Sequence, residues 1–292
     1  MSDVLAGRQA LVTGASQGLG LAIARAFVTS GASVFICGRD RATLEHARAE
    51  LAQLCGDGQE VVAEAADVAD PDVVESLVAA ATERFPELSI LVNNAGVYGP
   101  KGSIWDVDWR EWVQAIEINL FGSVLVARAL VPQLRRAGQG KIIQLSGGGA
   151  TRPLPARSAY AVSKAAIVRF METLAEETRD AGIDVNAIAP GALNTRMLDE
   201  VLAAGAARLG PQAHAALLQQ QRSGGAPLAK GAQLAVFLAS AASDGITGRL
   251  LSALWDPWPA LSRRGAELAG TDIYTLRRIT PEDRGLNWEE ET

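Results

Sequence analysis

The sequence predicts an α/β fold, a doubly wound and predominantly parallel sheet of seven strands with helices on both faces. Two observations carry this prediction. Short β-branched runs alternate with longer alanine-rich stretches along most of the 292 residues, and a glycine-rich segment follows the first run. Such alternation is typical of βαβ units, whose right-handed crossovers cover both faces of a sheet. Hydrophobic residues make up 48% of the chain, so we expect a single domain around one large core.

The elements follow one another in order along the chain. Short apolar runs predict strands at 9–13, 33–37, 61–65, 90–93, 141–146, 184–189 and 249–254. The stretches between them predict helices at 19–30, 42–54, 71–85, 109–137 and 158–181.

Two segments depart from this rhythm. Residues 192–230 form a long insertion after a strand, which predicts a lid over the site; two surface helices without a gating role are the alternative. Residues 259–292 are too short and polar to form a second core, so we interpret them as a C-terminal appendage. We expect the chain from 255 onward to pack on the body through its apolar side chains, Trp255, Trp258, Ile273, Tyr274 and Leu276.

Composition excludes several classes of function. The chain has 33 acidic against 27 basic residues, so no basic surface for nucleic acid or anionic lipid is predicted. Cys37 and Cys55 form no metal-binding spacing, and two histidines are too few for a cluster, so we expect no metal site. No signal-like N-terminus and no apolar window of about 18 residues are apparent. We expect a soluble, unprocessed, cytoplasmic protein with a small-molecule ligand.

The glycine-rich segment has the composition of a phosphate-binding loop. It follows the first predicted strand and opens a helix, where glycines let the backbone approach a pyrophosphate and the helix N-terminus offers free N–H groups. An ordinary strand-to-helix turn is the alternative. The residues expected to bind a dinucleotide here are Gly14, Ser16, Gln17, Gly18, Leu19 and Gly20.

The spacing of these glycines, TGxxxGxG, resembles the short-chain dehydrogenase/reductase family. Further motifs match it in order: NNAG at 93–96, an acid at 67, YxxxK at 160–164 and PGxxxT at 190–195. The resemblance covers roughly 7–255. It implies a Rossmann-like fold, a dinucleotide-binding catalytic domain over 1–258, and a homodimer or homotetramer. The further cofactor-binding residues that it implies are Asp67, Val68, Asn94, Ala95, Gly96, Pro190, Gly191 and Thr195.

The end of the second predicted strand bears on the choice between the two nicotinamide cofactors. An acid there would bind the ribose 2′-hydroxyl of NAD(H), but this chain has Gly38 followed by Arg39. A guanidinium can bind the 2′-phosphate, which favours NADP(H) over NAD(H). Two alternatives stay open: Asp40 reaches the ribose after a small backbone shift, or Arg39 stacks on the adenine.

Tyr160 and Lys164 are four residues apart, so they share one face of a helix. A free phenol has a pKa of about 10, and a nearby ammonium would stabilise the phenolate. By resemblance, Tyr160 exchanges a proton with the substrate oxygen, Lys164 lowers the pKa of Tyr160 and binds the nicotinamide ribose, and Asn119 holds a water in the proton relay.

One position departs from the family pattern. The substrate-orienting serine is expected thirteen residues before the tyrosine, and Gly147 occupies that position. Ser146 precedes Gly147, and Gly147 is the first of three consecutive glycines. Because glycine backbones are permissive, we predict that Ser146 is displaced inward and replaces the missing hydroxyl; otherwise the position is vacant.

The sequence therefore predicts an oxidoreductase that moves a hydride between a nicotinamide cofactor and a carbonyl or secondary alcohol. A regulator that binds NAD(P) without turnover is the alternative, because Gly147 lacks the serine. A 3-ketoacyl-carrier-protein-type reductase is the other, and it would need a basic patch near the site, to which Arg152, Arg157 and Arg196 could contribute.

Overall fold

The computed structural model describes residues 3–288, and the last four residues of the predicted appendage lie outside them. Its centre is a seven-stranded sheet in the order β3-β2-β1-β4-β5-β6-β7, with every neighbouring pair parallel. The strands are β1 Gln9–Thr13, β2 Ser33–Gly38, β3 Val61–Ala65, β4 Leu88–Asn93, β5 Gly140–Leu145, β6 Ile183–Ala189 and β7 Arg249–Ser252.

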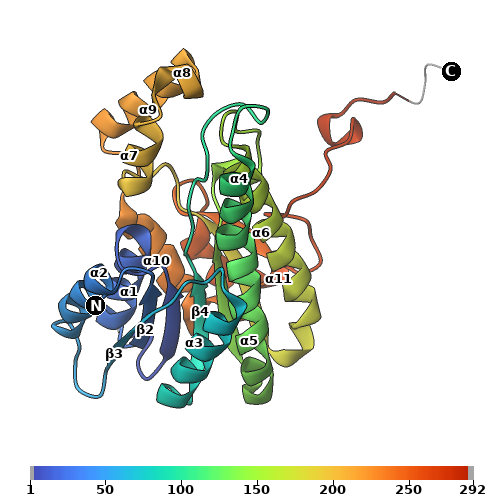
Figure 1. Ribbon diagram of the computed structural model, residues 1–292. Coiled ribbons are helices and arrows are strands. Elements are labelled where there is room, and N and C mark those ends of the chain that lie inside the picture. The colour runs from blue at the N-terminus through green and yellow to red at the C-terminus, as the bar shows by residue number, and fades with distance from the viewer. Residues whose placement is uncertain (1–2, 289–292) are drawn as a thin grey trace.

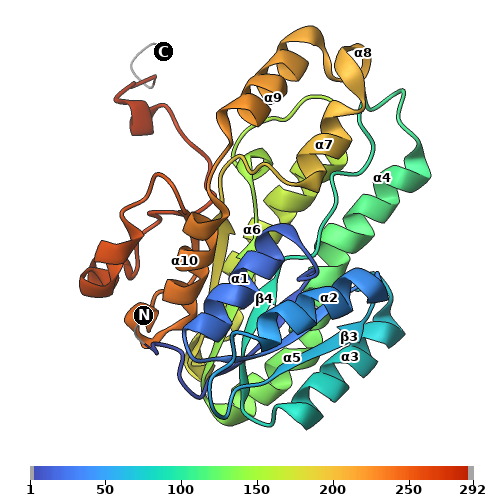
Figure 2. The ribbon, with the colours of Figure 1, turned by 90° about the vertical axis from the view of Figure 1, so that its left-hand side faces the viewer.

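Alternate residues along each strand supply two cores, one on each face of the sheet. In β1, Val12 joins the core beneath α1 Gly18–Thr29, α2 Arg41–Ala52 and α10 Leu228–Ala239. Its neighbour Leu11 joins the core beneath α3 Pro71–Arg84, α5 Gly122–Ala137 and α6 Ser158–Glu177. Figures 1 and 2 show these helices covering the two faces. The predicted doubly wound, Rossmann-like fold is confirmed.

Strand order reverses between β1 and β4, which are neighbours in the sheet but distant in the chain. In open α/β sheets, the crevice outside the carboxyl ends of the strands at such a switch point is where ligands bind. The glycine-rich segment follows β1, and residues 94–97 follow β4. Topology alone therefore brings both motifs to one edge of the sheet.

The predicted helix 109–137 is continuous but not uniform. It consists of α4 Trp109–Ile116, a π-helical turn at Glu117–Phe121, and α5. Asn119 lies in the middle of the π-helical turn. Such turns insert one extra residue and are frequent at functional sites.

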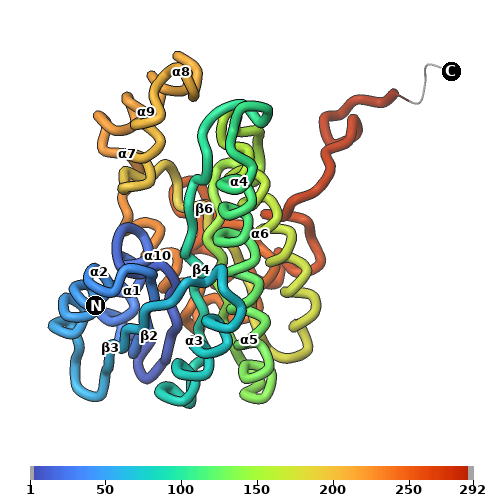
Figure 3. Tube along the Cα trace, in the orientation of Figure 1, coloured from blue at the N-terminus to red at the C-terminus, as the bar shows by residue number. Residues whose placement is uncertain are grey.

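The insertion folds as three helices, α7 Arg196–Leu202, α8 Gly205–Leu209 and α9 Pro211–Ser223, followed by the start of α10. They stand above the carboxyl edge of the sheet (Figure 3). Their small apolar cluster, centred on Leu198, Val201, Leu209 and Leu217, also includes Tyr98 and Ala156 from the body. The insertion therefore rests on the segments that surround the predicted site.

The C-terminal segment packs along the body as far as residue 276 and includes α11 Gly265–Leu268. The Trp258 ring lies 5.6 Å from that of Phe237, centroid to centroid, whereas Trp255 is 84% exposed. Arg249 donates hydrogen bonds to the carbonyls of Leu268, Thr271 and Ile273.

Candidate active site

The glycine-rich segment opens α1 without a side-chain cap. Asp40, Asp70 and Asp108 cap α2, α3 and α4 by accepting backbone N–H bonds, whereas Gln17 makes no such bond at α1. The first N–H groups of a helix need a partner, and the helix dipole favours an anion. This helix end is therefore suited to a pyrophosphate.

Two glycines are required by close approaches. A Cβ on Gly14 would lie 2.7 Å from the Cα of Ala95, and one on Gly20 would lie 2.4 Å from Nδ2 of Asn94. Both φ angles at Gly14 and Gly18, 64° and 60°, are in the left-handed region. A side chain at Gly14 or Gly20 would push the glycine-rich segment away from Asn94 and Ala95, which follow β4.

The NNAG motif locks this segment in place. Asn94 Nδ2 donates to the carbonyls of Thr13 and Gly14 at 3.0 and 2.9 Å. In return, Thr13 Oγ1 accepts from the backbone N–H groups of Asn94 and Ala95 at 3.0 and 3.1 Å. The β1 and β4 ends are thereby joined across the switch point, where Gly96 also lies.

Directly after β2, Arg39 is exposed, and the carboxylate of Asp40 is already hydrogen-bonded. The Asp40 carboxylate accepts from the backbone N–H and the hydroxyl of Thr43, at 2.8 and 2.7 Å. These bonds lower the pKa of Asp40. Ser16 lies beside this strand end, since its Oγ would be 3.3 Å from a Cβ on Gly38.

Asp67 and Val68 form the next part of this rim. The Asp67 carboxylate accepts from Ala69 N–H at 3.0 Å, which fixes the turn after β3. Val68 is buried against α5, where a Cβ on Gly122 would meet its side chain at 2.7 Å. Gly122 therefore lets Val68 approach the helix closely.

Thr195 precedes α7 and lies near the glycine-rich segment. A Cβ on Gly18 would be 3.6 Å from the Thr195 methyl carbon. Pro190 is buried, and Gly191 has a φ of 93° with Leu254 only 2.6 Å from where its Cβ would be. The insertion thus begins directly over the opening of α1, near Leu19.

Tyr160 and Lys164 lie on one face of α6, with Lys164 Nζ 5.6 Å from the centroid of the Tyr160 ring. Lys164 is 5% exposed, and its Nζ donates to the carbonyl of Leu145 at 2.7 Å. A third side chain that sequence reasoning missed completes the group: the Tyr98 ring packs against Tyr160 with centroids 4.4 Å apart. Tyr98 follows NNAG by two positions, which is the only signal that the sequence offers for it.

The pKa of Tyr160 differs from the sequence-based expectation. Burial raises the pKa of Tyr160, Tyr98 raises it further, and Arg157 opposes the rise. Burial lowers the pKa of Lys164 from its ordinary value of 10.5 to about 8. The expected fall in the pKa of Tyr160 is absent because desolvation penalises the phenolate more than nearby charge stabilises it. Tyr160 is therefore a neutral phenol at pH 7.

The side-chain amide of Asn119 forms hydrogen bonds with the backbone of Val97. Its Oδ1 accepts from Val97 N–H at 2.7 Å, and its Nδ2 donates to the carbonyl of Val97 at 2.8 Å. The same Nδ2 donates to Ser163 Oγ at 2.9 Å, and Ser163 donates to the carbonyl of Tyr160 at 2.8 Å. Asn119 thereby joins the π-helical turn, the segment after β4 and the catalytic helix.

The hydroxyl of Ser146 is directed at the backbone of α6 in this structure, and its replacement of the missing serine stays a prediction. This buried hydroxyl donates to the carbonyl of Lys164 at 3.3 Å, within α6. At Gly147, a Cβ would lie 2.7 Å from Tyr160 Oη. The phenol hydroxyl therefore occupies the space where the family serine would begin.

The comparisons with known proteins agree with this site. The family model described as short chain dehydrogenase matches residues 8–205. The chain belongs to the short-chain dehydrogenase family. It is 37% identical over 198 residues to a 1-deoxy-11-beta-hydroxypentalenate dehydrogenase of Streptomyces exfoliatus, covering 67% of this chain and 71% of that one. This short-chain dehydrogenase is accordingly an NAD(P)-dependent oxidoreductase, and the sequence-based prediction of family and activity is confirmed.

Two solved structures show how far the likeness extends. NAD⁺-bound xylitol dehydrogenase has a TM-score of 0.78 at 26% identity, covering 85% of this chain and 98% of that one. An actinorhodin polyketide ketoreductase variant with NADPH has a TM-score of 0.77 at 28% identity, covering 86% and 97%. The two structures hold different nicotinamide cofactors, so the likeness alone identifies the cofactor of this short-chain dehydrogenase only as NAD(P).

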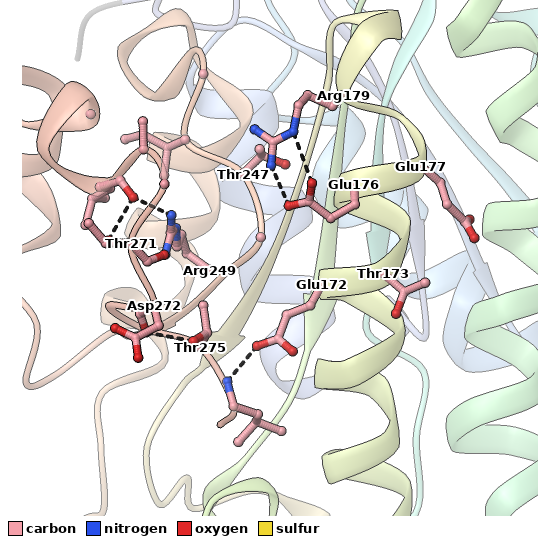
Figure 4. Close-up of a pocket in the computed structure, with 18 of the residues that line it drawn as sticks. Glu172, Thr173, Glu176, Glu177, Arg179, Thr247, Arg249, Thr271, Asp272 and Thr275 are labelled. Carbon is pink, nitrogen blue, oxygen red and sulfur yellow. Dashed lines mark hydrogen bonds and ion pairs between the residues drawn. The ribbon is translucent and has the colours of Figure 1, made fainter. Parts of the chain in front are cut away.

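A cleft of about 630 Å³ lies toward the C-terminal end of α6, away from Tyr160 of this short-chain dehydrogenase. It is lined by the C-terminal half of α6 and by the segment after β7 (Figure 4). Glu172 lies twelve residues beyond Tyr160 on α6, about 18 Å along the axis. The charged side chains that line the cleft are largely paired, as Arg179 is with Glu176. The cleft is therefore a junction with the C-terminal segment.

Two further observations concern the metal site and the membrane-spanning segment that the sequence was expected to lack. Within residues 3–288, no group of three or more His, Cys, Asp or Glu could hold a metal ion. Contrary to the sequence-based reading, the helix Trp109–Ala137 is long and apolar enough to cross a membrane by length and composition alone. In this short-chain dehydrogenase, 44% of its apolar window is buried, and Asn119 on this helix hydrogen-bonds to Ser163 of α6.

Proposed function

We propose that this chain transfers a hydride between NADP(H) and a carbonyl or secondary alcohol carbon, with Tyr160 as general acid and base. The observation that carries the proposal is the pairing of the Tyr160 phenol with the buried Lys164 ammonium at the carboxyl edge of the sheet. A nicotinamide bound along the α1 edge would supply or accept the hydride.

In the reductive direction, Tyr160 donates its proton to the substrate oxygen as the carbonyl carbon is reduced. Burial raises the pKa of Tyr160, so the phenol is protonated at pH 7 and has a proton to donate. The charge of Lys164 then stabilises the resulting phenolate. Asn119 acts as a positioning residue, since it ties α6 to the segment after β4 through Ser163 and Val97.

NADP(H) is the proposed cofactor. Gly38 places no carboxylate at the end of β2, and Asp40 already caps α2. Exposed Arg39 is thus the nearest charged group available for a 2′-phosphate, and the hydroxyl of Ser16 lies on the same side.

Of the two other functions considered, the NAD(P)-binding regulator keeps one supporting observation, the absence of a side chain at Gly147. The carrier-protein-linked reductase loses support. Arg157 is buried, and Arg196 pairs with Glu200 at 3.2 Å, so neither adds to an open basic patch.

The names of similar proteins refer to compounds as different as pentalenate and xylitol, so they do not identify the substrate of this chain. Assembly as a homodimer or homotetramer and a cytoplasmic location stay predictions.

Tyr160→Phe tests the function. It removes the phenol hydroxyl and keeps the ring that packs on Tyr98. Turnover of a panel of ketones with NADPH, followed by nicotinamide absorbance, should fall at least about a hundredfold. Dinucleotide affinity, measured by fluorescence, should stay within about twofold of wild type. Retained turnover in the variant would refute the role of Tyr160, and no turnover of any ketone or alcohol by the wild type would favour the regulator.

A further inference from the structure

Arg157 holds a guanidinium inside the protein without a counter-charge. Only 9% of the residue is exposed, and its Nε is buried with no hydrogen-bond partner. Throughout residues 3–288, no ion pair and no side-chain hydrogen bond involves it. Arginine is almost never buried unless paired, because removing its charge from water is unfavourable by several kcal/mol. The structure therefore contains a cation that lacks its anion.

The backbone before Arg157 is held in an unfavourable conformation. Ala156 has a φ of 62°, a left-handed value that is unfavourable for a residue with a Cβ by about 1 kcal/mol. Its carbonyl accepts from Gly102 N–H at 2.9 Å, and its side chain packs against the apolar cluster of the insertion. The turn that directs Arg157 into α6 is thus fixed from two sides. Such strain is most often retained where it positions a functional group.

Arg157 precedes Tyr160 by three residues, which is nearly one helical turn. Arg157 is the N-cap of α6, with φ −144° and ψ 46°, and Tyr160 lies in the first turn of the same helix. The charge of Arg157 opposes the rise that burial produces in the pKa of both Tyr98 and Tyr160. Arg157 and Tyr160 therefore belong to the same N-terminal turn of α6. An anion bound to Arg157 would lie within about one helical turn of Tyr160.

We propose that Arg157 binds a carboxylate of the substrate, so that the protein acts on compact hydroxy acids or keto acids. The planar fork of the guanidinium matches a carboxylate with two parallel hydrogen bonds. The short separation from Tyr160 allows only a few bonds between the carboxylate and the reacting carbon. This inference rests on the proposed function for the identity of the reacting carbon, but the binding of the carboxylate is measured without turnover.

The experiment uses two matched pairs of probes and the full chain. Calorimetry or saturation-transfer NMR would compare 3-hydroxybutyrate with 3-hydroxybutyramide, and mandelate with mandelamide. In wild type, at least one carboxylate should bind about tenfold or more tightly than its amide. Arg157→Met should abolish that difference, and Arg157→Lys should keep part of it. Arg136→Met is the matched control, because Arg136 is exposed near the end of α5, at the edge of the sheet opposite Tyr160.

Thermal unfolding provides a second readout that separates a binding role from a structural one. Without ligand, Arg157→Met should raise the unfolding midpoint, because an unpaired buried charge is removed. A lowered midpoint combined with unchanged carboxylate binding would make Arg157 structural and overturn the inference. Equal affinity for carboxylates and amides in wild type would overturn it too, including no detectable binding of either.

The same probes distinguish failure of this inference from failure of the proposed function. Tyr160→Phe should still prefer carboxylates to amides, because Arg157 is intact. If the wild type reduces neutral ketones yet shows no preference for carboxylates, the inference fails and the function stands. If Tyr160→Phe keeps full turnover while the preference persists, the assigned role of Tyr160 fails and the inference stands.

Discussion

The hydroxyl of Tyr160 lies 2.7 Å from the point where a side chain at Gly147 would begin. Gly147 has a φ of 177°, which is extended backbone that any residue adopts. The requirement for glycine is therefore one of space and not of backbone freedom. A side chain at this position and the present position of the phenol exclude each other.

Gly147→Ala should displace the Tyr160 phenol, because a methyl group at 2.7 Å from Oη is closer than van der Waals contact. A shift of about 1 Å in a catalytic group lowers the rate about a hundredfold, so we expect kcat to fall by 10- to 100-fold. Steady-state kinetics with NADPH and a ketone would measure it. Gly148→Ala is the control, since its Cβ would meet only Arg152 at 3.6 Å. Equal kinetics for the two variants would mean that the phenol is not constrained by this contact.

Lys164 should make the free energy of unfolding depend on pH. Its pKa is about 8 in the folded protein against an ordinary 10.5, so between these values the unfolded chain binds more protons. Stability contributed through this residue therefore rises as pH increases from 8 to 10. The gain corresponds to about 1 to 3 kcal/mol.

Urea unfolding of wild type and Lys164→Met would measure that gain. The difference between their free energies of unfolding should shift in favour of wild type as pH rises from about 8 to 10. The exposed Lys230 provides the control, and Lys230→Met should show no comparable trend. A constant difference for Lys164→Met would contradict the lowered pKa.

Arg39→Ala should weaken NADP(H) far more than NAD(H). The loss corresponds to roughly 1.5 to 3 kcal/mol, as for a hydrogen bond to a charged group. Fluorescence titration of both reduced cofactors would test it. Asp40→Asn is the matched control, because the amide oxygen can still cap α2 through Thr43. Equal weakening of both cofactors by Arg39→Ala would assign Arg39 to adenine stacking, and weaker NAD(H) binding in Asp40→Asn would assign Asp40 to the ribose.

The sequence was sufficient for the features that depend on local pattern. Short apolar runs such as the one that contains Leu11 and Val12 predicted the strands, and the i, i+4 spacing predicted the shared face of Tyr160 and Lys164. The glycine spacing predicted the opening of α1, because the close approach to Asn94 leaves no room for a Cβ. These features depend on neighbours in the chain or on a single switch point.

The remaining features depend on packing between distant segments. The direction of Ser146 is set by a carbonyl on α6, and the burial of Arg157 follows from a left-handed turn at Ala156. The π-helical turn at Asn119 adds one residue to a helix without changing its apolar pattern. Desolvation of Tyr160 likewise requires Tyr98, which arrives from the segment after β4. No local pattern encodes such contacts.

Arg249 should hold the C-terminal segment on the body without serving catalysis. Its guanidinium donates to the carbonyls of Leu268, Thr271 and Ile273 at 2.6 to 2.8 Å, and 7% of the residue is exposed. Arg249 begins β7, so in a parallel sheet it lies at the amino edge, opposite the site. Arg249→Gln should therefore destabilise the segment and leave dinucleotide affinity unchanged.

Limited digestion with chymotrypsin and urea unfolding would measure this loss. In Arg249→Gln, cleavage at Tyr274 should become faster, and the free energy of unfolding should fall by about 2 to 4 kcal/mol, because three carbonyls lose a charged donor. Arg278→Gln changes an exposed arginine of the same segment and should leave both measurements unchanged. If Arg249→Gln resists chymotrypsin like wild type, the contacts of Trp258 and α11 are sufficient to hold the segment. A loss of dinucleotide affinity in this variant would instead mean that the C-terminal segment is coupled to the opposite edge of the sheet.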